Sequence, residues 1–126
     1  MLKRSLLAAS LGLAVLALAP TAYAQSRNSI EIRQSGYANE LAARVDGHRN
    51  RLSLEQRGVR QFISTLQDGT RNGAQVSQEG GDNQAGLSQQ GRRNRVVIGQ
   101  EGWLNDAFSS QSGYGNVVGV AQIGEG

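Results

Sequence analysis

The sequence predicts an all-β fold, a β-solenoid of stacked strand–turn–strand coils whose two sheets are parallel, in register and amyloid-like. Three observations predict it. Glycine recurs every 11 residues along most of the chain without an insertion or deletion, glutamine lies two positions before it, and asparagine lies three positions after it. A fixed internal period of this kind is typical of repeat architectures, in which each unit buries its apolar face by stacking on the next.

The first 24 residues (1–24) differ in composition from the rest and are predicted to be a secretory signal peptide. Lys3 and Arg4 precede an apolar run at 6–18, and residues 22–24 form a small-x-small cleavage site. The apolar run is shorter than the roughly 20 residues that a membrane-spanning helix needs. We therefore expect no transmembrane segment once the signal is removed, and a protein that is secreted through the periplasm.

The mature chain is predicted to consist of a short N-terminal tail at 25–27 and a repeat domain at 28–126, and it carries little net charge. Removing Lys3 and Arg4 leaves 11 basic residues against 10 acidic ones, so the net charge is 11 − 10 = +1. A balanced chain gives weak support for a nucleic-acid partner. Cysteine is absent, so disulfides cannot stabilise the domain. The polar, glycine-rich composition alone would suggest disorder, and the repeat argues against it.

Three columns of residues define the repeat. The turn glycines are Gly36, Gly47, Gly58, Gly69, Gly80, Gly91, Gly102, Gly113 and Gly124. The glutamine column reads Gln34, Val45, Gln56, Gln67, Gln78, Gln89, Gln100, Gln111 and Gln122, with one exception. The asparagine column reads Asn28, Asn39, Asn50, Gln61, Asn72, Asn83, Asn94, Asn105 and Asn116, again with one exception.

The residues between asparagine and glycine have the pattern of a short strand. Six residues follow each asparagine, as at 29–34, 51–56 and 95–100, and apolar residues occupy the second and fourth places. A period of two is expected of a half-buried strand, and glycine then supplies the backbone freedom of a tight turn. A helical 11-residue repeat would place a glycine in every unit, at a cost of about 1 kcal/mol each. Each unit is therefore predicted to be one strand and one turn.

Two units make a coil of 22 residues, so that each residue lies about 4.8 Å from the one 22 positions away. This sorts the strands into two sheets. The first has wholly apolar inward columns: Ile30, Leu52, Ala74, Val96, Val118 and Ile32, Leu54, Val76, Ile98, Val120. The second is smaller and more polar inside: Leu41, Ile63, Ala85, Ala107 and Ala43, Thr65, Leu87, Ser109. We expect the first sheet to be the better template.

Glutamine and asparagine share the inward parity of the apolar positions, so their amides are predicted to be buried. Identical amides stacked at strand spacing can satisfy one another, as in the ladders of cross-β assemblies. The ladder predicted to support assembly is Asn28, Gln34, Asn50, Gln56, Asn72, Gln78, Asn94, Gln100, Asn116 and Gln122. Val45 and Gln61 both fall in the second sheet. We therefore expect loss of Gln78 to harm assembly more than loss of Gln67.

The stretch from Asn72 to Gln89 reads N-x-A-x-V-x-Q-x-G-x-x-N-x-A-x-L-x-Q, and the stretch from Val96 to Ala107 follows the same pattern. This resembles the curlin repeat, and the resemblance spans residues 28–124. It implies a subunit of curli, the extracellular amyloid fibres of bacterial biofilms, at the cell surface. It also implies three kinds of partner: other copies of itself, a second curlin subunit, and a curli-type secretion channel with accessory proteins.

Departures from the family pattern leave alternatives open. The usual serine that starts the repeat is asparagine here, and the glycine-rich N-terminal segment of major subunits is reduced to residues 25–27. The abundant arginine resembles a minor subunit that nucleates another curlin, whereas the regular end at 121–126 resembles a fibre-forming subunit. A soluble β-solenoid adhesin or binding module is a further alternative.

The sequence offers little for catalysis, and a polyanion stripe is its one other candidate site. With one histidine, no cysteine and no carboxylate pair beside a base, we expect no enzyme, no metal site and no cofactor. Arg49, Arg71 and Arg93 are 22 apart, so they stack on one corner and could bind polyanions such as extracellular DNA. Asp46 and Asp68, at the same corner, favour instead an internally balanced, solvated surface.

Overall fold

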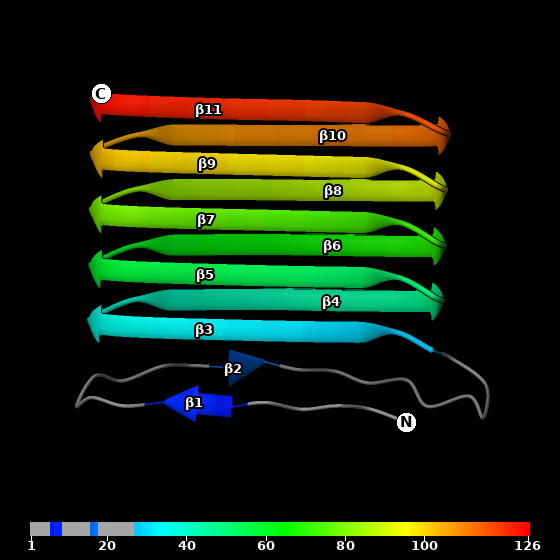
Figure 1. Ribbon diagram of the computed structural model, residues 1–126, viewed down its shortest axis with the longest axis horizontal. Helices are drawn as coiled ribbons and strands as arrows, with labels where there is room; N and C mark the ends of the chain where they lie inside the picture. Colours follow the sequence, from blue (N-terminus) through cyan, green and yellow to red (C-terminus); the bar gives the residue numbers. More distant parts are fainter. Residues whose placement is uncertain (1–5, 9–15, 18–26) are drawn as a thin grey trace.

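The computed structural model describes residues 6–8, 16–17 and 27–126, which form two sheets of parallel strands. The first sheet contains, in order, β1 (Leu6–Ala8), β3 (Ser29–Tyr37), β5 (Arg51–Val59), β7 (Gly73–Gly81), β9 (Arg95–Trp103) and β11 (Val117–Glu125). The second contains β2 (Leu16–Ala17), β4 (Glu40–His48), β6 (Phe62–Thr70), β8 (Gln84–Arg92) and β10 (Asp106–Tyr114). Strands of the two sheets alternate along the chain and run in opposite directions, so each pair completes one coil of a β-solenoid (Figure 1).

The register follows the 22-residue coil throughout the repeats, as the sequence predicts. Ile30 pairs with Leu52, and Leu52 pairs with Ala74 on the next coil. The backbone ladder also continues through the turns, where Arg71 N donates to His48 O at 3.0 Å. Because a slip of one residue would turn every apolar side chain outward, the buried columns fix this register.

The strands are longer than the sequence analysis predicts. Each repeat strand has nine residues rather than six, because it continues through the glycine and ends one residue after it. Gly36 pairs in register with Gly58, so the expected turn glycine is part of the ladder. The turn itself is reduced to two residues, Ala38 and Asn39 in the first coil.

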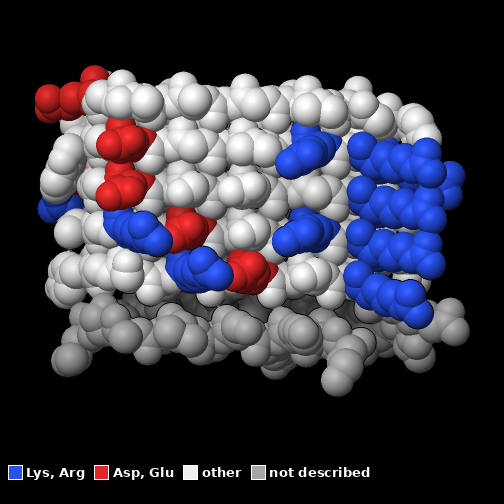
Figure 2. Space-filling view, viewed as in Figure 1, with Lys and Arg blue, Asp and Glu red and all other residues white. Residues whose placement is uncertain are grey.

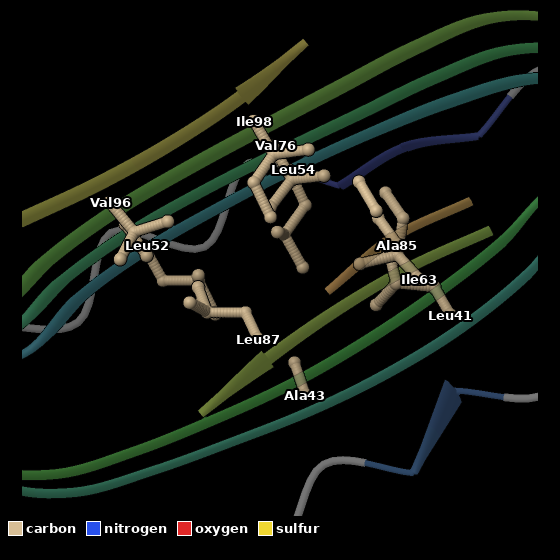
Figure 3. Packing of buried hydrophobic residues seen from close by; sticks show 12 residues of the cluster. Leu41, Ala43, Leu52, Leu54, Ile63, Val76, Ala85, Leu87, Val96 and Ile98 are labelled. Atoms are coloured by element: carbon tan, nitrogen blue, oxygen red, sulfur yellow. The ribbon is translucent and has the colours of Figure 1, made fainter. Parts of the chain in front are cut away.

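The core lies between the two sheets and is filled by the predicted inward columns (Figure 3). Leu52 and Leu54 of the first sheet are each 1% exposed, and Ile63 faces them from the second. Burying side chains of this size contributes about 1.5–3 kcal/mol each. Half of the buried apolar residues of the second sheet are alanines, such as Ala43 and Ala85, so its share of the apolar burial is smaller.

Two short strands come from the segment predicted to be a signal peptide. β1 pairs with β3, and β2 pairs with β4. The predicted cleavage site at 22–24 and the tail residues Gln25 and Ser26 lie outside the described residues, and the boundary at residue 24 stays a prediction. In the described part of the chain, no helix has the length and hydrophobicity needed to cross a membrane.

The glycine column is required by both conformation and space. Gly80 has a φ of 115°, in the region that favours glycine. A Cβ atom added there would lie 2.0 Å from the carbonyl oxygen of Gly102 on the next coil. The same close approach recurs at Gly58, whose added Cβ would lie 1.8 Å from the Gly80 oxygen. A side chain in this column would therefore force neighbouring coils apart.

We expect Gly80→Ala to lower the free energy of unfolding by at least about 2 kcal/mol, because alanine adds both backbone strain and a clash with the next coil. Gly99→Ala is the matched control, since no atom lies within 4 Å of a Cβ added at Gly99. It should leave stability unchanged or slightly raised. Urea unfolding followed by circular dichroism measures both, and equal effects of the two substitutions would contradict the close-approach argument.

Candidate functional site

The glutamine columns form hydrogen bonds in two directions. Within the first sheet, Gln56 Nε2 donates to Gln78 Oε1 at 3.1 Å, and Gln78 Nε2 donates to Gln100 Oε1 at 2.7 Å. The second N–H of the same amide donates to the other sheet, from Gln78 Nε2 to Phe62 O of β6 at 3.2 Å. Gln78 therefore links consecutive coils and also ties the two sheets together, and Gln56, Gln67 and Gln89 do the same. The predicted rung-to-rung contacts are present in this column.

The asparagine columns act differently, and the prediction that they form a side-chain ladder is wrong for most of their length. Asn72 Nδ2 donates to two backbone oxygens, Asp68 O at 3.1 Å and Gly91 O at 3.2 Å. Its Oδ1 accepts from the backbone N–H of Asn94 at 3.1 Å. The asparagine side chain is one methylene shorter than glutamine and stands at the turn, where backbone groups lie within its reach. It therefore closes the turn and ties it to the next coil.

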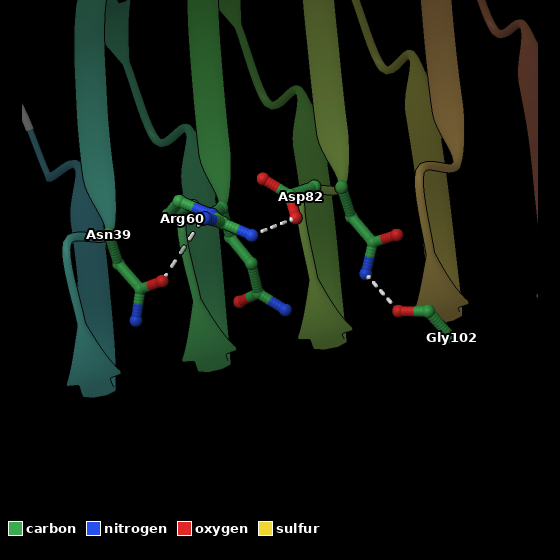
Figure 4. A network of polar contacts seen from close by, with 6 residues as sticks. Asn39, Arg60, Asp82 and Gly102 are labelled. Atoms are coloured by element: carbon green, nitrogen blue, oxygen red, sulfur yellow. Dashed lines mark hydrogen bonds and ion pairs between the residues drawn. The ribbon is translucent and has the colours of Figure 1, made fainter.

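This asparagine arrangement recurs at the other corner, where one side-chain contact is an exception. Asn39 Oδ1 accepts from Gln61 N, and an asparagine one coil further on donates to Gly102 O (Figure 4). Among the described residues, the direct asparagine–asparagine side-chain bond is that of Asn105 Nδ2 with Asn83 Oδ1, at 3.2 Å. Satisfied backbone groups at each turn allow the coils to change direction within two residues.

Both exceptions in the columns leave buried oxygen atoms without partners. Val45 has no amide to offer, so Gln67 Oε1 on the next coil accepts no hydrogen bond. Gln61, longer than the asparagine it replaces, keeps its bond to Arg57 O but leaves its own Oε1 unpaired. Thr65 Oγ1 is the third such atom in the described chain. All three lie in or beside β6, so the second sheet is the weaker one, as its sequence suggests.

Gln78 and Gln67 thus differ in environment although their local sequences are alike. Gln78 accepts one hydrogen bond and donates two. Gln67 donates two, to Gln89 Oε1 at 2.7 Å and Arg51 O at 3.3 Å, and its oxygen is unpaired. Removing Gln78 would leave more broken contacts, in line with the expectation from the sequence.

The turns also contain a feature that the sequence analysis missed. The residue that precedes an asparagine of the column has a left-handed backbone conformation, with φ of 58° at Arg49, 60° at Arg71 and 57° at Arg93. Such a conformation is uncommon for residues other than glycine, asparagine and aspartate. A sequence signal existed in Gly115, which occupies the same place in the last coil, and in Asp82 at the other corner.

Charged side chains are segregated on the face shown in Figure 2, with ion pairs at one side and arginine alone at the other. The pairs run along the strands, as between Arg33 and Glu31 and between Arg57 and Glu55, each at 2.6 Å. Asp46, which the sequence analysis places at the corner of the arginine stripe, pairs with Arg44 at 2.7 Å. Arg44 and Asp46 lie two residues apart in β4, so their side chains are on the same face of the strand.

The arginine stripe is longer than the sequence analysis states. Arg27 lies 22 residues before Arg49 and extends the column, and Arg51 and Arg95 stand beside it on β5 and β9. Among the described residues, these six arginines have no acidic partner: Arg27, Arg49, Arg51, Arg71, Arg93 and Arg95. Arg93 packs instead on Tyr114, its Cζ 5.5 Å from the ring centroid, and donates to the tyrosine hydroxyl.

The opposite corner has no such column. Its left-handed positions are Ala38, Arg60, Asp82 and Leu104. Arg60 donates to Asp82 at 2.7 Å, and this hydrogen bond, with the charge of Asp82, raises the pKa of the guanidinium above its ordinary value (Figure 4). The two corners share a backbone conformation but differ completely in charge.

The described residues contain no cluster of histidine, cysteine or carboxylate side chains that could hold a metal ion. What the geometry offers is a regular stack of amides and backbone groups. Residues 69–102, which include β7, β8 and all of β9 but its last residue, match the family model of the curlin associated repeat. This segment is therefore similar to curlin repeats. The family resemblance predicted from the sequence is confirmed there, and the same 22-residue register is present from β3 to β11. The searches of curated proteins and of solved structures returned no match.

We expect Gln78→Leu to lower the free energy of unfolding by about 2–3 kcal/mol, since it leaves buried amide groups of Gln56 and Gln100 without partners. Gln67→Leu should cost about 1 kcal/mol less, because it also removes an oxygen that has no partner. Urea unfolding of the freshly purified chain compares the two. A larger loss for Gln67→Leu would contradict the assignment of the first sheet as the stronger one.

We expect Val45→Gln to raise the free energy of unfolding by about 1 kcal/mol, because the new amide can donate to Gln67 Oε1. Val45→Leu serves as the control, since it adds apolar volume without a donor. The same urea titration measures both variants. If leucine stabilised the chain as much as glutamine, packing rather than the unpaired oxygen would explain the gain.

Proposed function

We propose that this curlin-repeat protein is a secreted structural subunit that self-polymerises into extracellular curli-type amyloid fibres, which serve biofilm matrix, adhesion and surface attachment. The observation that supports this most directly is the unfinished glutamine ladder. Gln111 and Gln122 each donate one amide proton to a backbone oxygen, and within the described residues the second proton has no acceptor. At the other end Gln34 donates to Gln56, and its own oxygen accepts no hydrogen bond from a described residue.

These two ends are complementary. A second copy could place Gln34 Oε1 over one of the free amide protons, and its backbone would extend the same ladder. Within the described chain, β10 and β11 have no strand on their outer side. β11 also exposes large apolar side chains, Val117 at 73% and Ile123 at 82%. Unprotected edges of this kind are templates for further strands, and head-to-tail contacts that do not close produce filaments.

The other edge is accessible only after the leader has gone. β1 and β2 pair with parts of β3 and β4. Removal of residues 1–24 as a signal peptide would expose both strands to an incoming copy. In this proposal the chain is exported through the periplasm and passes a curli-type secretion channel with accessory proteins. It then joins a fibre at the cell surface, with a second curlin subunit as a further partner.

Two alternative functions, a nucleating minor subunit and a soluble adhesin, can be tested by measuring polymerisation of the purified chain. The abundant arginine favours a minor subunit that nucleates another curlin. In that case substoichiometric amounts would accelerate polymerisation of the other subunit, while the chain alone would polymerise poorly. A soluble adhesin or binding module would persist as a monomer.

We expect the purified mature chain, residues 25–126, to form fibres that bind thioflavin T and diffract at the spacing of about 4.8 Å between strands. Val120→Lys should lengthen the lag phase severalfold, because it puts a charge on the inner side of the edge strand β11, where Val120 packs against the core.

Ala121→Lys is the matched control, since Ala121 is exposed on the outer side of the same strand. It should leave the lag within about twofold of the unmodified chain, because a solvated charge leaves the ladder intact. Persistent monomer after prolonged incubation of the unmodified chain, without thioflavin signal, would overturn the fibre proposal.

A further inference from the structure

We propose that the arginine face of a single subunit binds an acidic polysaccharide. The site combines the corner column, defined as Arg27, Arg49, Arg71 and Arg93, with a hollow beside it. The inference does not depend on polymerisation, because both features lie on the side of one solenoid and not at its ends.

The corner column is unfavourable for the isolated chain in two ways. Its guanidinium groups repeat on successive coils, about 4.8 Å apart, and like charges placed opposite one another on neighbouring strands are destabilising. Arg49, Arg71 and Arg93 also hold left-handed backbone conformations, for which glycine or asparagine would be better suited. The corresponding corner across the solenoid keeps that backbone with alanine, leucine and an Arg60–Asp82 pair. The fold therefore does not require arginine here, and a ligand with repeated negative charges would relieve the repulsion.

The hollow lies next to this column, on the outer face of the first sheet. Arg51, Gly73 and Arg95 pair in register on successive strands, so the missing side chain of Gly73 leaves a gap between two arginines. A Cβ built at Gly73 would meet no atom within 4 Å. Ser53 and Gln75 line the same hollow and can hydrogen-bond hydroxyl groups. Figure 2 shows the arginines of this side of the face without an acidic side chain among them.

The shape and chemistry of the hollow favour a sugar chain over nucleic acid. Its lining contains arginine, serine, glutamine, glycine, alanine and valine, and no aromatic side chain. Single-stranded nucleic acids are usually held by base stacking on aromatic rings, and Tyr114 at the end of the column is engaged by Arg93. A gap one residue wide admits a single extended chain but not a duplex. A linear polysaccharide offers regular anions for the column and hydroxyls for Ser53 and Gln75.

The test measures binding of oligosaccharides to the freshly purified chain by titration calorimetry at low and moderate salt. The probes are an oligogalacturonate, a sulfated heparin oligosaccharide, neutral dextran and single-stranded DNA. We expect the first, the second or both to bind, with dextran inactive. The two acidic probes show whether carboxylate or sulfate is the preferred group.

The column is tested with Arg49→Asn/Arg71→Asn/Arg93→Asn, in which asparagine removes the charge and tolerates the left-handed backbone. Affinity should fall at least about tenfold, and its dependence on salt should weaken, as fewer counterions are released. Arg33→Gln/Arg44→Gln/Arg57→Gln removes the same charge from arginines that are already paired, and should change affinity less than about twofold. Circular dichroism confirms that both variants are folded.

The hollow is tested with Gly73→Gln, which fills the gap without altering charge. Oligosaccharide affinity should fall severalfold, whereas binding of DNA should be unaffected. Equal losses in the two triple variants would overturn the site, because net charge alone would then explain binding. DNA binding as tight as the acidic sugars, with no effect of Gly73→Gln, would overturn the polysaccharide assignment in favour of a general polyanion surface.

Discussion

A buried glutamine amide in this solenoid is hydrogen-bonded both along its own sheet and across to the opposite one, and the rest of the structure depends on that double contact. Gln78 Oε1 accepts a hydrogen bond from Gln56 on the coil before. Its Nε2 donates one hydrogen bond to Gln100 on the coil after and another to Phe62 O of β6. A buried amide without partners costs about 1–3 kcal/mol. The same residue must therefore occur on every coil, and the 22-residue spacing cannot change without orphaning the next amide.

The glycine and asparagine columns follow from the same requirement. Coils close enough for amide contact bring the glycine backbones together, with no room for a Cβ atom. The chain must then reverse within two residues, and asparagine satisfies the backbone groups that such a turn exposes, as Asn72 does at Asp68 and Gly91. The three columns are thus one interlocking solution. The two exceptions to the glutamine and asparagine columns, Val45 and Gln61, both fall in the second, less apolar sheet, which contributes less to stability.

The sequence was sufficient for the fold because its dominant forces repeat with a simple period. Alternating apolar residues and fixed glycines predicted where each strand begins, the two sheets, the register and the core, but not the extension of each strand through the glycine. The sequence was insufficient to predict hydrogen-bond partners where several acceptors or donors of similar chemistry lie near one side chain. Asparagine and glutamine have the same amide, so only their lengths and distances from the turn decide that Asn72 bonds to backbone and Gln78 to its own kind. The ion pairs show the same limit, since the sequence did not predict that Asp46 pairs with Arg44 of its own strand.

Outward positions make no contribution to the ladder, so their composition can vary without changing the fold, and any regularity there needs a separate cause. At the corner opposite the arginines, the same backbone accepts Ala38, Asp82 and Leu104, which is the variety expected when only solvation matters. The arginine column instead repeats one residue type. Repulsion between like charges and the left-handed backbone both make arginine unfavourable at these positions. Stacking amplifies the departure, because one arginine per coil becomes a continuous line of charge along the axis. A polymer of subunits would repeat that line along its length, and multivalent contact would then convert weak individual sites into strong attachment.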